Sequence, residues 1–175
     1  MKKLFVVFSF FTLLSVSAFG QFEQTVSKIK VAFIYNFTRL IEWPPDYTQG
    51  DYFVIGVLNA SPALLTELNT LTQKTTGKQH FTIKNFKSVD EISKCNILFI
   101  PEGSNNLLAE ALKKIHGTST LLITESEGDA KKGSAINFIV KDNKQAFELN
   151  KANAEKNHLT VSSSLRTLAA TYFEQ

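Results

Sequence analysis

Side chains able to act as nucleophiles, bases or metal ligands are few and scattered along this chain. The 175 residues contain one cysteine, and the three histidines, His80, His116 and His158, are far apart. A single thiol forms neither an intramolecular disulfide nor a four-cysteine zinc site. The eight glycines form no GxGxxG or P-loop motif, and there is no GxSxG or HExxH. We therefore expect no catalytic residues, no metal and no cofactor, and predict that the protein is not an enzyme.

Cys95 and a run of three serines are the remaining candidates for reactive or anion-binding groups. Cys95 directly precedes the apolar segment 96–100, and no sequence signature pairs it with a histidine. This pattern favours a buried, inert thiol over a nucleophile. Ser162, Ser163 and Ser164 stand at the start of the last expected helix, where capping by Ser162 or Ser163 is favoured over anion binding.

The segment Glu42-Trp43-Pro44-Pro45 contains the only tryptophan, at the point where a helix is expected to end. Trp43 either closes one end of the core or contributes to a pocket or partner surface, since aromatic side chains dominate binding hot spots. Tyr35, Arg39 and Glu42 follow one another at four- and three-residue steps and would share one helix face. This face is either a solvated stripe or a binding surface. Our candidate partner contacts are Tyr35, Arg39, Glu42 and Trp43.

A second group of polar residues is the candidate for binding a small ligand. Glu148 and Asn150 alternate with apolar residues along one expected strand. Such polar residues usually meet water, although beside a helix they can build a buried network. A cleft lined by Asn137, Glu148, Asn150 and Arg166 is the hypothesis for a charged ligand, although a lone arginine on the last helix is more often a surface residue.

The hydrophobic pattern predicts the elements that must position these residues. Apolar residues at three- and four-residue steps predict helices at 23–42, 61–73, 105–115, 151–156 and 164–172. Short apolar or alternating segments predict strands at 52–58, 81–86, 96–100, 120–123, 135–141, 145–150 and 159–161. Residues 75–79 and 125–133 are expected to be loops. Strands that alternate with helices indicate an α/β fold: one compact three-layer domain with a mostly parallel central sheet of about six strands, an antiparallel hairpin, and helices on both faces.

Residues 1–20 have the pattern of a secretory signal peptide. Lys2 and Lys3 precede an apolar stretch, and Ala18-Phe19-Gly20 resembles a cleavage site, so we expect cleavage near Gly20-Gln21 and a mature domain from 21 to 175. The alternative is an N-terminal membrane anchor, although the apolar run is shorter than the roughly 20 residues that span a bilayer. No later segment predicts membrane insertion. Without residues 1–20 the net charge falls from +3 to +1, which gives no electrostatic case for nucleic acid or anionic lipid.

Four segments, in the same order, resemble the YfiR-like family of exported bacterial proteins. Lys30–Pro44 (KVAFIYNFTRLIEWP) is similar to the family's opening helix and its Glu-Trp-Pro ending. The other three are Lys94–Pro101 (KCNILFIP), Ala135–Asn150 (AINFIVKDNKQAFELN) and His158–Ala169 (HLTVSSSLRTLA). The resemblance covers essentially all of residues 25–170. It departs from the family at Glu125–Gly133, where Asp129 replaces a common aromatic residue.

The resemblance implies a function in envelope signalling. The family's name-giving member is a periplasmic repressor that binds an inner-membrane diguanylate cyclase and so keeps cyclic-di-GMP and biofilm formation low. By this resemblance we expect a non-enzymatic periplasmic regulator that binds the extracytoplasmic domain of a membrane diguanylate cyclase or sensor kinase. Homodimer formation is a further expectation. Because Cys95 is the only cysteine, control by an internal disulfide is not carried over. The alternative is a periplasmic small-molecule-binding sensor module.

Overall fold

A central mixed sheet organises the computed structural model, which describes residues 23–174. Within these residues, eight strands lie side by side in the order β10-β8-β7-β6-β5-β2-β4-β3. β4, β2, β5, β6 and β7 are mutually parallel, whereas β3 and β8 are antiparallel to their neighbours β4 and β7. The bounds are β2 Tyr52–Leu58, β3 Thr75–Thr76, β4 Gln79–Phe86, β5 Ile97–Ile100, β6 Leu121–Thr124, β7 Ile136–Lys141, β8 Lys144–Asn150 and β10 Thr171–Phe173. The predicted α/β fold with a mostly parallel sheet and an antiparallel hairpin is confirmed.

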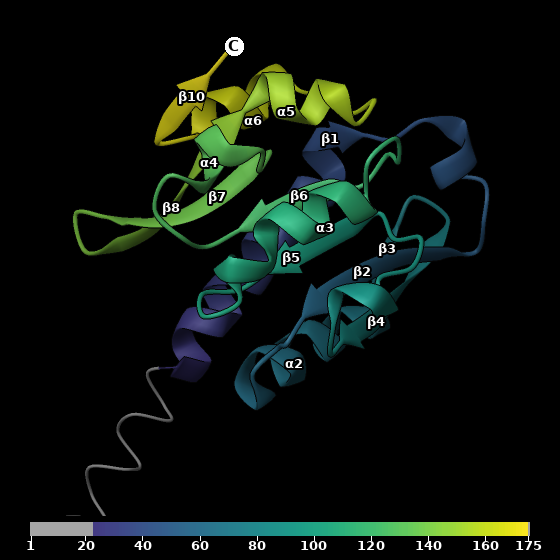
Figure 1. Cartoon of the computed structure of the whole chain (residues 1–175). Coiled ribbons are helices and arrows are strands. Elements are labelled where there is room, and N and C mark those ends of the chain that lie inside the picture. Colours follow the sequence, from purple (N-terminus) through teal and green to yellow (C-terminus); the bar gives the residue numbers. More distant parts are fainter. Residues whose placement is uncertain (1–22, 175) are drawn as a thin grey trace, which may run out of the picture.

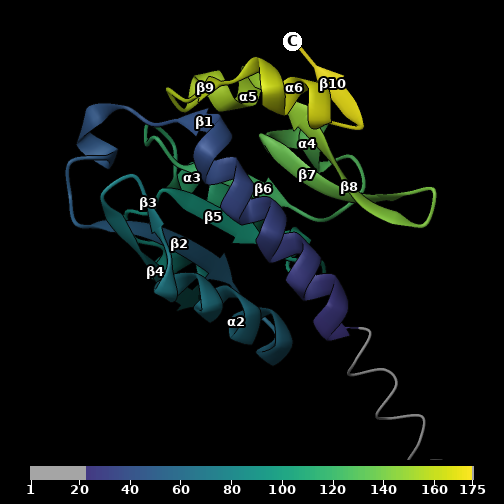
Figure 2. The same ribbon diagram turned by 180° about the vertical axis from the view of Figure 1, so that it is seen from behind.

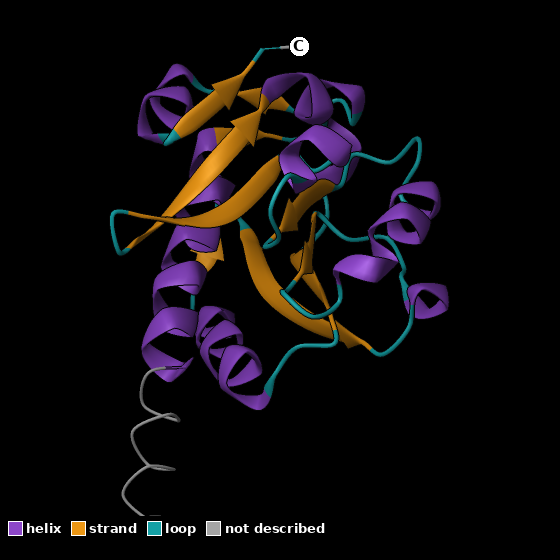
Figure 3. Ribbon diagram, turned by 60° about the vertical axis from the view of Figure 1, so that its left-hand side comes forward, coloured by secondary structure: helices purple, strands orange, loops and turns teal. Residues whose placement is uncertain are grey.

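Helices cover both faces of this sheet. The first helix, residues 23–40, runs diagonally across one face together with α2, and α3 covers the other face (Figures 1 and 2). The view in Figure 3 shows the sheet between these two helical layers. The bounds are α2 Pro62–Asn69, α3 Leu108–Lys114, α4 Asp129–Lys132, α5 Lys151–Lys156 and α6 Ser163–Leu168. No helix among residues 23–174 has the length and hydropathy needed to cross a membrane.

The side chains of the central strands point alternately into two hydrophobic clusters, one on each face of the sheet. In β5, Ile97 and Phe99 pack into the cluster beneath the first helix, whereas Leu98 and Ile100 pack into the cluster beneath α3. Successive side chains of a strand point to opposite faces, so a strand covered on both sides must be apolar throughout. This requirement explains why the apolar segments predicted these strands well.

The first helix ends two residues earlier than its apolar pattern predicts. Ile41 and Glu42 form the short strand β1, which pairs with Val161 and Thr160 of β9 (Thr160–Val161) in an antiparallel ladder. The backbone groups of Ile41 and Glu42 find partners across this ladder instead of within the helix. The ladder attaches the end of the first helix to the C-terminal part of the chain, beside α5 and α6 (Figure 2).

Other predicted bounds also differ from the structure. The last helix ends at Leu168, and residues 171–173 form β10, which extends the sheet along β8. Residues 125–133 contain the short helix α4. Thr75–Thr76 form β3, which turns through Gly77 into β4. Ser61 and Ser162 cap their helices as expected, because their hydroxyls accept hydrogen bonds from the N–H groups of Leu64 and Leu165.

The proposed signal peptide lies outside the described residues. Its cleavage and the location of the protein therefore stay predictions from the sequence.

Candidate partner-binding site

Trp43 closes one end of the core and is held there by a polar contact. Its side chain is 9% exposed, and its ring meets Phe53 edge to face with the ring centroids 5.0 Å apart. Its indole Nε1–H donates a 3.1 Å hydrogen bond to the backbone carbonyl of Asn96. Buried tryptophans usually need such a partner, because an unpaired indole N–H is costly inside a protein.

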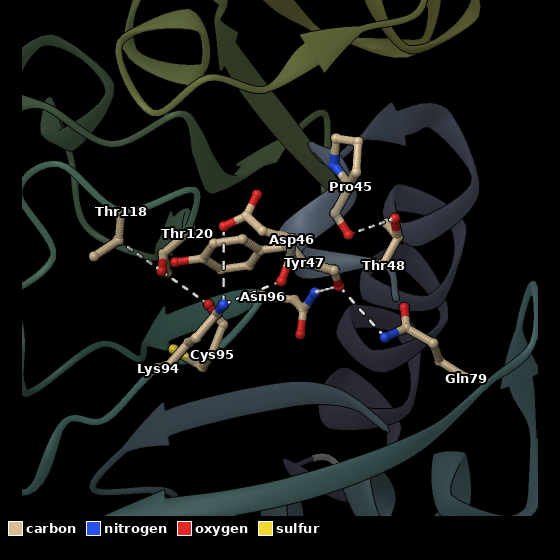
Figure 4. Close-up of polar contacts among 10 residues, drawn as sticks. All are labelled: Pro45, Asp46, Tyr47, Thr48, Gln79, Lys94, Cys95, Asn96, Thr118 and Thr120. Atoms are coloured by element: carbon tan, nitrogen blue, oxygen red, sulfur yellow. Dashed lines mark hydrogen bonds and ion pairs between the residues drawn. The ribbon is translucent and has the colours of Figure 1, made fainter. Parts of the chain in front are cut away.

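Two buried amides fix the loop that follows Trp43. Asn96 Nδ2 donates to the carbonyl of Tyr47 at 3.0 Å, while its Oδ1 accepts from the N–H of Val54 at 2.9 Å. Gln79 Nε2 donates to the carbonyls of Tyr47 and Tyr52 at 3.3 and 3.0 Å. Figure 4 shows both amides directed at Tyr47. The loop thus has a defined position relative to β2, β4 and β5.

Charged residues at the outer side of this loop are solvent-exposed and contribute less to the stability of the loop than the two buried amides do. Lys94 Nζ lies 4.2 Å from the centroid of the Tyr47 ring and donates to the Asp46 carbonyl at 3.1 Å. The ion pair between Lys94 and Asp46 has an N–O distance of 3.9 Å, with both side chains more than half exposed. Exposed pairs of this kind contribute about 0–1 kcal/mol. They cover the Tyr47 ring but do not define the loop.

A groove of about 260 Å³ opens beside Trp43. Ile41, Trp43 and Phe53 form its apolar part, and exposed Glu42 and Lys78 bring opposite charges to its lining. The other lining residues are Thr38, Thr48, Thr76, Gly77 and Gln79. An apolar surface with polar residues around it is the usual anatomy of a protein interface. We call this groove the Trp43 groove.

Two of the four predicted partner contacts, Glu42 and Trp43, line this groove, and the four do not all lie on one helix. Tyr35 and Arg39 are on the first helix, whereas Glu42 belongs to β1, so the prediction of a shared helix face is wrong for Glu42. Tyr35 is half-buried: its ring contacts Phe81 edge to face, and Lys74 Nζ lies 4.6 Å from its centroid. Arg39 and Glu42 are exposed. Their role in partner binding stays a prediction.

Only two of the four predicted ligand residues contact each other. Asn137 Nδ2 donates to Glu148 Oε2 at 2.9 Å, so this pair does lie together. Asn150 Nδ2 instead donates to the Ala130 carbonyl, and its Oδ1 caps α5. Arg166 stacks over the Tyr172 ring, with Cζ 4.5 Å from the centroid. A ligand role for this set stays a prediction.

Cys95 is 1% exposed, and burial raises the pKa of its thiol to about 12. The thiolate is the nucleophilic form, so this cysteine is unreactive at neutral pH. Among the described residues, no three His, Cys, Asp or Glu side chains are placed to hold a metal ion.

The sequence reasoning missed Asn96, Gln79 and Lys78. Lys78 is part of a polar turn with no hydrophobic pattern. The one usable sign for Asn96 was its place as a polar residue directly before the fully apolar strand β5. Such a position predicts an amide at the amino end of a buried strand, where loop backbone groups need partners.

These observations define a class: a doubly wound α/β domain that presents an apolar groove at the amino ends of its parallel strands. The chain belongs to the YfiR/HmsC-like family, whose family model matches residues 27–170. No curated protein matches the chain significantly. The suspected family resemblance is therefore confirmed.

Proposed function

We propose that this protein is a periplasmic, non-catalytic regulator that binds the extracytoplasmic domain of a membrane signalling protein. Membership of the YfiR/HmsC-like family supports this proposal, since that family is associated with regulation of diguanylate cyclase signalling. The partner is a diguanylate cyclase or a sensor kinase. Control of a cyclase would link the protein to cyclic-di-GMP levels and biofilm formation.

The observation that carries the proposed interface is the Trp43 groove. Trp43 and Phe53 are fixed by ring packing and by the hydrogen bond to Asn96, so the groove has its shape before a partner arrives. A preformed site loses less conformational entropy on binding. The groove accepts an apolar side chain of the partner, while exposed Arg39 and Glu42 contact polar groups around it.

Regulation requires a difference in affinity between two states of the partner. A protein that binds both states equally shifts no equilibrium, however tightly it binds. The regulator must therefore bind the inactive form more tightly than the active form. A tenfold difference corresponds to about 1.4 kcal/mol.

The small-molecule alternative has less support. Asn137 donates to Glu148 and accepts from Thr124 and Ser126, Asn150 bonds backbone groups, and Arg166 stacks on Tyr172. A charged ligand would have to displace these contacts.

Co-purification tests the proposal. The C-terminally tagged protein is expressed in its own host, cross-linked gently, and captured after the envelope is solubilised. Recovery of a membrane cyclase or kinase above an untagged control is the expected result. Well-expressed, folded protein that captures no membrane signalling protein would contradict the proposal.

A further inference from the structure

The outer half of the β7–β8 hairpin extends beyond its neighbours in the sheet. β6 pairs with β7 only at Ile136 and Asn137, and β10 pairs with β8 only from Glu148 onward. β7 and β8 nevertheless stay paired with each other up to the turn at 142–143. This projecting ribbon is seen at the left of Figure 1 and the right of Figure 2. Among the described residues, no strand pairs with residues 138–141 on the side of β6.

The free edge of β7 presents main-chain hydrogen-bonding groups. The carbonyl of Phe147 accepts a 2.9 Å hydrogen bond from the N–H of Ala170, so Phe147 directs its groups away from β7. Phe138 lies opposite Phe147 in an antiparallel register and therefore directs its groups away from β8. These directions alternate from one residue to the next along a strand. The N–H and C=O groups of Val140, two residues after Phe138, therefore also point away from β8. The side chain of Val140 is 74% exposed.

A groove of about 370 Å³ follows this edge and is acidic. Its lining contains Phe138, Ile139, Val140, Gly128 and Gln145, four glutamates, and no lysine or arginine; the glutamates are Glu102, Glu125, Glu127 and Glu148. We call it the β7 groove. It lies at the carboxyl ends of β5 and β6, whereas the Trp43 groove lies at the amino ends of β2 and β4.

Nearby cations offset only part of this negative charge, and exposed Lys141 and Lys144 stand opposite each other at the outer end of the ribbon. Lys30 forms an ion pair with Glu125, and both side chains are largely buried. Lys132 Nζ pairs with Asp129 at 3.2 Å and donates to the backbone carbonyl of Glu127. The carboxylates of Glu102 and Glu127 are on exposed residues beside the free edge.

We propose that the β7 groove binds an extended peptide segment of a partner protein, in which lysine or arginine residues alternate with apolar ones. The segment adds as a strand to residues 138–141. Main-chain hydrogen bonds to Phe138 and Val140 supply affinity, and the exposed carboxylates of Glu102 and Glu127 select positive charge. Unprotected edges with exposed apolar residues invite aggregation, so natural proteins usually cover them. This site is separate from the Trp43 groove and does not depend on its proposed function.

Fluorescence anisotropy tests the proposal with the purified protein and a labelled peptide. The probe is an acetylated octapeptide amide of alternating lysine and valine. Val140→Pro removes the outward N–H without touching the bonds to β8, whereas the matched control Val140→Thr keeps it. We expect binding to weaken at least fivefold in Val140→Pro and less than twofold in Val140→Thr. A probe with two adjacent central prolines, which lacks donors on both edges, should also bind at least fivefold more weakly.

A second variant keeps the test decisive if Val140→Pro disturbs folding. Glu102→Gln with Glu127→Gln alters exposed carboxylates only, and should weaken binding at least fivefold at an unchanged thermal midpoint. Equal binding by all variants, or equal binding of the proline probe, would overturn strand addition. Val140-dependent dimerisation that the peptide fails to disrupt would overturn it in favour of a second copy as occupant. The double variant Arg39→Glu with Glu42→Lys should bind the peptide as tightly as wild type does. That result shows that peptide binding does not involve the Trp43 groove.

Discussion

The indole N–H of Trp43 donates to the backbone carbonyl of Asn96, a residue 53 positions further along the chain. This bond joins the segment after the first helix to the amino end of β5. The Asn96 side chain then holds the loop that continues from Trp43. Asn96 therefore bonds both Trp43, which lines the groove, and the loop that follows it, and so fixes the two relative to each other.

Substitution of Trp43 should separate packing from hydrogen bonding. Trp43→Ala removes a buried ring and should lower the free energy of unfolding by about 3–5 kcal/mol. Trp43→Phe keeps an aromatic ring against Phe53 but loses the bond to Asn96, so a loss of about 1–2 kcal/mol is expected. Urea denaturation measures both. Leu168→Ala, at a side chain 63% exposed, is the control and should change stability by less than about 0.5 kcal/mol. A loss below about 1 kcal/mol in Trp43→Ala would contradict the core role.

Asn96→Leu should destabilise the protein although the side chain is of similar size. The substitution leaves the N–H of Val54 without its partner and takes one donor from the carbonyl of Tyr47. Buried groups that lose their partners cost about 1–3 kcal/mol each, so we expect about 2–4 kcal/mol in urea denaturation. The exposed Asn105→Leu is the matched control. Equal stability of the two variants would show that the amide does not hold the loop.

Substitution by alanine at two glycines should have opposite effects on the stability of the protein. A Cβ at Gly56 would lie 2.5 Å from Cε2 of buried Phe86, so Gly56→Ala should cost about 1–3 kcal/mol. A Cβ at Gly50 meets nothing within 4 Å, so Gly50→Ala should be neutral or stabilise by up to about 1 kcal/mol. Thermal denaturation compares the two directly. A neutral Gly56→Ala would mean that β2 and Phe86 pack less closely than the structure describes.

The thiol of Cys95 should be protected from reagents in the folded protein. Because burial raises its pKa to about 12, almost no thiolate exists at pH 8. We expect reaction with a disulfide reagent to be at least a hundredfold slower in native protein than in denatured protein. Comparable rates in the two states would contradict the buried position.

The same pKa shift predicts a dependence of stability on alkaline pH. The folded pKa of about 12 lies above the ordinary value of 9.0, so the native state favours the neutral thiol. Its contribution is fully present below pH 9 and is lost as the pH rises towards 12. The free energy of unfolding should therefore fall more steeply above pH 9 in wild type than in Cys95→Ala. Parallel profiles for the two proteins would count against the shift.

The sequence predicted those elements whose hydrophobic pattern lies within the segment itself. β2, β5 and β6 are apolar on both faces and could be recognised without knowledge of their neighbours. β1 and β10 have only two or three residues each, and their formation depends on partners far away in the sequence, whereas the equally short β9 was predicted at 159–161. The end of the first helix was misplaced for this reason, since Ile41 continues the apolar stripe but pairs with Val161.

The site was only partly predictable. Trp43 was recognised as either a core residue or part of a pocket, and the structure places it in both roles. Gln79 has no sequence pattern that indicates a buried amide, and Asn96 has only its place before an apolar strand, because the partners of both are backbone groups of other segments. The β7 groove was not foreseen, since it arises from the unequal lengths of neighbouring strands.

The most direct test of the account compares partner recovery by two charge-swapped variants. Arg39→Glu with Glu42→Lys alters the surface beside the Trp43 groove, and Glu110→Lys with Lys113→Glu makes the same kind of change on α3, across the sheet. Both pairs are exposed, so both variants should keep the wild-type thermal midpoint. The account predicts that the first variant recovers at least tenfold less membrane signalling protein than wild type, and that the second recovers as much. Equal recovery by all three proteins would contradict it.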